Sequence, residues 1–66
     1  MIEAPTVYAN EHARYVNPDA GITAMILNYP GRFVVVLRDD DAGLEVGRRQ
    51  YPDIDAADAY ARKLIA

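Results

Sequence analysis

Side chains that could carry out covalent chemistry are scarce in this chain. It contains no serine and no cysteine. Its only aliphatic hydroxyl groups are those of Thr6 and Thr23, and its only lysine is Lys63. Covalent catalysis requires a nucleophile that a neighbouring base activates. The single histidine, His12, lies in a segment with no clear pattern, where we expect it to pack or to face solvent. We therefore expect a protein that is not an enzyme.

Metal and cofactor sites also lack their usual patterns. The acidic run Asp39-Asp40-Asp41 does not have the Asp-x-Asp-x-Asp-Gly spacing of a calcium loop, and no apolar residues are interleaved to raise a carboxyl pKa. Without cysteine, the common zinc patterns and disulfides are excluded. Neither Gly43 nor Gly47 is followed by the Lys-Ser/Thr pair of a phosphate loop. We expect no metal and no cofactor.

Negative charge is the most conspicuous resource for binding. The net charge is -3, and seven of the ten acidic residues fall between positions 39 and 58, where Arg48 and Arg49 are the only bases. Carboxylates grouped on one surface could occupy a basic groove built for phosphates. The alternative is that they serve only loop solubility and helix capping. The candidate partner-binding residues are Asp39, Asp40, Asp41, Glu45, Asp53, Asp55 and Asp58.

Arginine and tyrosine provide the competing interpretation. Six arginines and five tyrosines are many for 66 residues, and both types are enriched at binding hot spots. The tyrosines could equally pad the rim of a small core. A DNA-binding face would use Arg32, Arg38, Arg48 and Arg49, although the overall negative charge opposes phosphate binding.

The elements that would position these residues are clearest after residue 20. Residues 1–20 form an arm whose structure stays undecided, because Tyr8, His12 and Tyr15 have helical spacing in a segment that suits extended chain equally well. Apolar runs over 22–27 and 33–37, separated by a Pro30-Gly31 turn, predict two strands. Residues 44–50 predict a third strand at the edge of the sheet. An Asp53 N-cap and apolar residues at helical spacing predict a helix over 53–65.

The sequence therefore predicts an α+β fold in one domain, residues 1–66. We expect a three-stranded antiparallel sheet over 21–50, in the order 1-2-3, with the C-terminal helix packed on one face. No segment approaches the roughly 18 apolar residues of a membrane helix, so we expect a cytoplasmic protein without membrane contact. A monomer or a weak homodimer, associating along the exposed third strand, is expected.

Two resemblances extend these expectations. The first is carried by three consecutive segments: the stretch from Phe33 through the Asp39-Asp40-Asp41 turn, the strand to Arg49, and the segment from Tyr51 to Ala61. Together these segments resemble the AP2-like, arm-type DNA-binding domains of phage integrases. This likeness implies a basic sheet face that binds DNA. In size and acidic character the chain is similar to the small phage-encoded inhibitors called anti-CRISPR proteins. That resemblance implies a phage protein in a bacterial host cell, which acts as a DNA mimic or covers the protein surface of a CRISPR surveillance complex or its nuclease.

Overall fold

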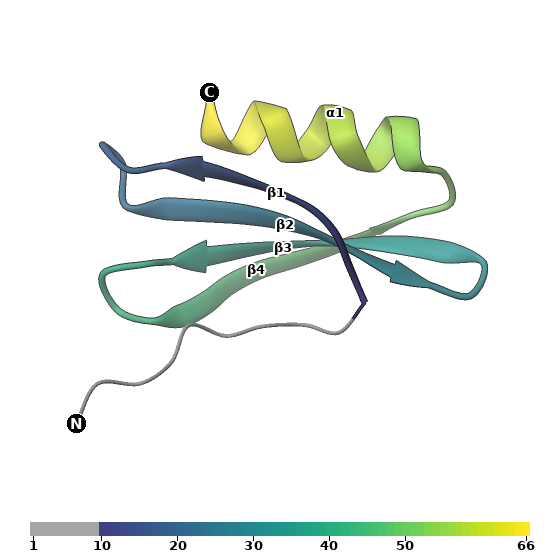
Figure 1. Ribbon diagram of the computed structural model, residues 1–66, viewed down its shortest axis with the longest axis horizontal. Coiled ribbons are helices and arrows are strands. Elements are labelled where there is room, and N and C mark those ends of the chain that lie inside the picture. Colours follow the sequence, from purple (N-terminus) through teal and green to yellow (C-terminus); the bar gives the residue numbers. More distant parts are fainter. Residues whose placement is uncertain (1–9) are drawn as a thin grey trace.

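Within the residues that the structure describes, a four-stranded antiparallel sheet carries one helix across one face (Figure 1). The structure is a computed structural model that describes residues 10–66. The elements are β1 (Glu11–Asn17), β2 (Ile22–Tyr29), β3 (Arg32–Asp39), β4 (Leu44–Tyr51) and α1 (Ile54–Ile65). Because the sheet order is β1-β2-β3-β4, each strand pairs with the next one along the chain.

The antiparallel sheet with a C-terminal helix confirms the predicted α+β class, but the prediction of three strands is wrong. The additional strand is β1, inside the arm that the sequence left undecided, and it pairs with β2 through contacts such as Tyr15↔Ala24. Its residues alternate between half-buried and exposed, with Ala13 and Tyr15 toward the helix. His12 and Tyr15 therefore lie in a strand, although their spacing would also suit a helix. Tyr8 lies outside the described residues.

Local sequence explains the tight connection between β2 and β3. Tyr29 and Arg32 are paired across the two strands, so Pro30 and Gly31 form a two-residue turn. Gly31 has φ +74°, which the second central position of a type II turn requires and which glycine adopts without steric cost. The predicted turn therefore sets the register of the two central strands.

The helix begins where the sequence predicts. Asp53 is the N-cap, and its carboxylate accepts a hydrogen bond from the backbone N–H of Ala56 at 2.8 Å. Arg62 and Lys63 lie in the last turn, where positive charge complements the helix dipole. Within residues 10–66 no helix has the length and the apolar character needed to cross a membrane.

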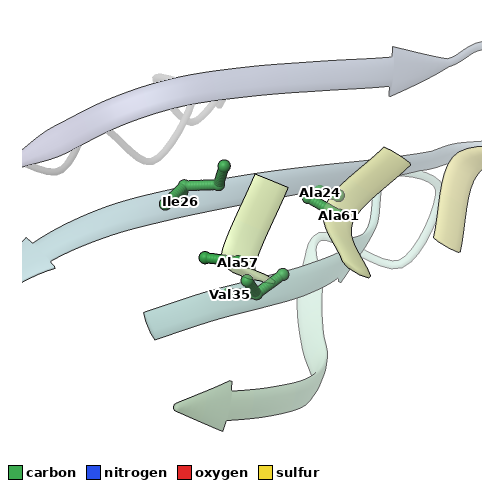
Figure 2. Close-up of a cluster of buried hydrophobic side chains, with 5 residues drawn as sticks. All are labelled: Ala24, Ile26, Val35, Ala57 and Ala61. Carbon is green, nitrogen blue, oxygen red and sulfur yellow. The ribbon is translucent and has the colours of Figure 1, made fainter. Parts of the chain in front are cut away.

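The core between helix and sheet is made of small and β-branched side chains. Figure 2 shows Ala24 and Ile26 of β2, Val35 of β3, and Ala57 and Ala61 of α1 gathered in this layer. Each of these residues is at most 1% exposed. Two alanines on the helix allow its backbone to approach the sheet closely, so this interface leaves no room for larger side chains at those positions.

A second buried cluster lies on the opposite face of the sheet. It consists of Met25 and Leu27 of β2 with Val34 and Val36 of β3, none of which is more than 3% exposed. Side chains alternate between the two faces along a strand, so these residues point away from α1. The central strands therefore contribute apolar side chains to both faces, as the continuous run in β3 predicts.

Candidate binding surfaces

The turn between β3 and β4 holds three of the predicted acidic residues together. Asp39 stabilises the turn itself, because its Oδ1 accepts the backbone N–H groups of Asp41 at 3.1 Å and Ala42 at 3.2 Å. Asp40 accepts a hydrogen bond from the Thr23 hydroxyl at 2.7 Å. Asp41 makes no side-chain hydrogen bond or ion pair with any residue in the 10–66 range. Of the three, Asp41 has the carboxylate most available to a partner.

The β1–β2 turn lies against this acidic turn. The Asp40 backbone N–H donates to the Gly21 carbonyl at 2.8 Å, and a Cβ on Gly21 would stand 2.8 Å from the Asp41 carboxylate. This contact brings Asp19 to the same end of the sheet as Asp39, Asp40 and Asp41. We call these four residues the acidic end. Sequence reasoning missed Asp19, because the joining of two separate turns is a tertiary contact.

Arg38 is the arginine closest to the acidic end. Its Nε lies 3.9 Å from Asp40 Oδ1, at the limit of an ion pair, and this buried nitrogen has no hydrogen-bond partner in the described part of the chain. Arg14 also attracts Asp40, but Asp19, Asp39 and Asp41 form no ion pair with any described residue. The acidic end therefore keeps a negative potential.

Of the other predicted acidic residues only Glu45 lies near this group, across from Arg38, and its carboxylate is already engaged. Glu45 is bound by Arg48, whose Nη2 and Nε lie 2.9 and 3.1 Å from its carboxylate oxygens, and this hydrogen bonding lowers the pKa of Glu45. Asp53 caps the helix. Because α1 starts at the far end of β4, Asp53 and Asp55 are separated from the acidic end by an eight-residue strand, about 25 Å. The β3–β4 turn and the start of α1 lie at opposite ends of the sheet, so Asp39, Asp40 and Asp41 are separated from Asp53 and Asp55 (Figure 1).

Asp58 is engaged in a contact between the helix and β1. The Tyr15 hydroxyl donates to Asp58 Oδ1, and Arg62 Nε lies 2.8 Å from Asp58 Oδ2. These hydrogen bonds hold the pKa of Asp58 below its ordinary value, and the same contact with Asp58 raises the pKa of Tyr15. The Arg62 guanidinium also lies 4.7 Å from the centre of the Tyr15 ring. This cluster joins the helix to the first strand.

The four arginines proposed for DNA binding do not share one face. Arg32, Arg38 and Arg48 point away from the helix by strand alternation, whereas the neighbouring Arg49 points to the helix side. On the face away from the helix lies a further arginine that sequence reasoning missed. This is Arg14, which Glu11 binds at 2.7 Å.

Both outer strands hold an arginine–glutamate pair three residues apart, Glu11–Arg14 on β1 and Glu45–Arg48 on β4. In a regular strand such residues would face opposite sides. Each pair spans a register irregularity, which shifts one residue and places the two side chains on the same face. Much of the positive charge on the face away from the helix is therefore neutralised within the molecule.

Aromatic and arginine side chains gather at the other end of β4. The Arg49 guanidinium lies over two rings, 5.6 Å from the centre of Tyr51 and 5.3 Å from that of Tyr60. Arg32 lies 5.1 Å from the centre of the Tyr29 ring. We call these five residues the Tyr–Arg cluster, which is divided between the two faces of the sheet: Arg49, Tyr51 and Tyr60 lie on the helix side, and Tyr29 and Arg32 lie on the other. Gly31, Arg32, Gln50, Tyr51 and Pro52 line an adjoining open cleft of about 370 Å³.

The remaining candidates for chemistry stand apart. His12 packs edge-on against Phe33 at 6.0 Å between ring centres, and the Thr23 hydroxyl donates its hydrogen bond to Asp40. Within residues 10–66 no three residues of the His, Cys, Asp and Glu types are close enough to hold a metal ion. Thr6 lies outside the described residues.

Comparison of the chain with protein-family models, with curated proteins and with solved structures gave no match.

Proposed function

We propose that this chain is a non-enzymatic protein-binding domain that blocks nucleic-acid recognition by placing its acidic end on a basic surface of the partner. The observation that carries the proposal is the joining of two turns, which presents Asp19, Asp39, Asp40 and Asp41 at one end of the sheet with Arg38 as the nearby counter-charge. Carboxylates held on well-ordered turns can stand where phosphates would otherwise bind.

The proposed surface keeps Asp39, Asp40 and Asp41 of the sequence-derived set and adds Asp19, whereas Asp55 lies at the far end of the sheet. Glu45, Asp53 and Asp58 are left out, because their carboxylates already serve an ion pair, the helix cap and the contact with β1. A CRISPR surveillance complex or its nuclease is a partner of the required kind, since each must expose a basic channel to nucleic acid.

Direct DNA binding is the weaker candidate. Arg38 and Arg48 each have a carboxylate within 4 Å, so a phosphate would have to displace an internal ion pair. A gel-shift titration with duplex DNA at low salt separates the two functions, because phosphate binding would appear there and weaken steeply as salt is added. Our proposal predicts no shift.

The test of the acidic end is charge reversal at its two least engaged residues. Tagged protein is incubated with a bacterial lysate, and captured proteins are eluted with duplex DNA, which competes for basic surfaces. The double variant Asp19→Lys with Asp41→Lys should lose the DNA-eluted proteins. Asp55→Lys, a reversal of the same kind at the far end of the sheet, should retain them.

Circular dichroism establishes that each variant is folded before capture is compared. If the double reversal captures the same DNA-eluted proteins as Asp55→Lys, the acidic end has no part in binding and the proposal is wrong.

A further inference from the structure

The outer edge of β4 is exposed over nearly its whole length. β4 is the last strand of the sheet, and every residue from 44 to 50 is exposed. A register irregularity lies near Val46, but pairing with β3 is regular from Gly47 to Tyr51. Along this regular part, the backbone groups that point away from β3 have no strand partner among the described elements. An exposed, regular edge is a template for one more strand.

Two arginines beside this edge differ from the other four. Arg14, Arg38, Arg48 and Arg62 each lie within 4 Å of a carboxylate. Across the described residues, Arg32 and Arg49 have no such carboxylate and lie instead over tyrosine rings. Stacking limits the motion of a planar guanidinium while its N–H edges stay free to bind an anion. At this end of β4 the guanidinium groups of Arg32 and Arg49 are therefore held in place and can bind carboxylates of a partner.

The cleft adds a place for a side chain. Tyr51 and Pro52 give it apolar walls, and Arg32 and Gln50 supply hydrogen-bond donors. Its volume of about 370 Å³ is near the lower limit of small-molecule sites, which suits one or two side chains of a peptide.

From these three features we infer that an extended, acidic peptide segment of a partner protein binds as a fifth strand along Gly47–Tyr51. Its backbone pairs with the outer edge of β4, its carboxylates bind Arg49 and Arg32, and one apolar side chain enters the cleft. This surface is separate from the acidic end, so either assignment can fail without the other.

Two other occupants fit the observations less well. In an antiparallel pair of two β4 edges over this segment, Arg49 of one copy would lie directly across from Arg49 of the other, which is unfavourable. Single-stranded nucleic acid binds by stacking bases on aromatic faces. Here the Tyr29, Tyr51 and Tyr60 rings each already have a guanidinium over them.

Fluorescence anisotropy with a fluorescein-labelled valine-rich peptide that carries two neighbouring glutamates tests the inference, because neighbouring side chains of a strand point to opposite faces and can reach Arg49 and Arg32. Arg49→Gln and Arg32→Gln should each weaken binding about tenfold, as expected for one lost charge-assisted hydrogen bond. Lys63→Gln removes the same charge from an exposed position on the helix and should leave affinity unchanged. A peptide with lysine in place of glutamate should not bind.

Backbone pairing is tested with N-methylated forms of the same peptide. Methylation of alternate amides should abolish binding for one of the two possible sets, because only one set faces β4. The inference is overturned if both methylated peptides bind like the parent or if the glutamate peptide does not bind. Two other results would also overturn the inference. One is that an oligothymidylate binds as tightly as the peptide. The other is that the protein forms a dimer that Arg49→Gln disrupts and that the peptide does not dissociate.

Discussion

Truncation of Leu27 tests the buried layer on the face away from the helix. Leu27 is fully buried in β2, and replacement by alanine removes three carbon atoms from its cluster. At about 0.8 kcal/mol for each buried carbon, the transfer free energy alone amounts to about 2.4 kcal/mol. The cavity that remains adds to this, so we expect Leu27→Ala to lower the free energy of unfolding by about 2–5 kcal/mol.

Urea denaturation followed by circular dichroism measures this loss. A domain of this length has a free energy of unfolding of only about 3–10 kcal/mol, so the Leu27 variant could be largely unfolded in water. Val36→Ala, which removes two carbons from the same cluster, then provides a milder truncation with a transfer free energy of about 1.6 kcal/mol. Val16→Ala is the control, because Val16 is 52% exposed and its truncation should cost less than about 0.5 kcal/mol.

The reasoning would be refuted if Leu27→Ala cost no more than Val16→Ala. That result would mean that the face away from the helix is not a packed layer in solution.

Two further predictions concern the helix. The pKa of Asp58 is lowered mainly by the Tyr15 hydroxyl, so ionised Asp58 stabilises the fold above the ordinary aspartate pKa of about 3.9, and this stability is lost as the pH falls through the lower pKa of the folded state. Asp58→Asn should therefore flatten the acid side of the stability–pH curve measured by urea denaturation, and an unchanged curve would contradict the assignment. Asp53→Ala should lower the free energy of unfolding by about 1 kcal/mol and the Tm by about 4–8 °C, whereas Asp53→Ser should retain most of the cap. Equal losses in a thermal melt for both Asp53 variants would show that the carboxylate does not cap α1.

The parts of the fold that the sequence predicted are those decided by neighbouring residues. The Pro30-Gly31 turn depends on the backbone preferences of two residues. The Asp53 cap depends on a hydrogen bond to Ala56, three residues further along the chain. β1 was missed for a physical reason. As an edge strand with one face toward the helix it has few apolar residues, and the adjacent Tyr15 and Val16 give no apolar–polar alternation in the sequence.

Placement of the candidate binding residues was predicted less well, because it depends on topology. Asp39, Asp40 and Asp41 stay together as neighbours in sequence, but Asp53 and Asp55 lie a full strand away once β4 is extended. The separation of Arg48 from Arg49 could have been deduced from the alternation of side chains in a strand. The Tyr–Arg cluster could not, since Tyr60 meets Arg49 only after the helix folds back over the sheet.

The contact between α1 and β1 has a consequence for the order of folding. Every strand pairs with its neighbour along the chain, so the sheet can form by successive hairpins with short loops to close. The bonds from Tyr15 to Asp58 and from Asn17 to Ile65 join residues 43 and 48 positions apart. Contacts so distant along the chain cost the most loop-closure entropy, and we expect them to form last. Docking of the helix end on the first strand would then complete the native state.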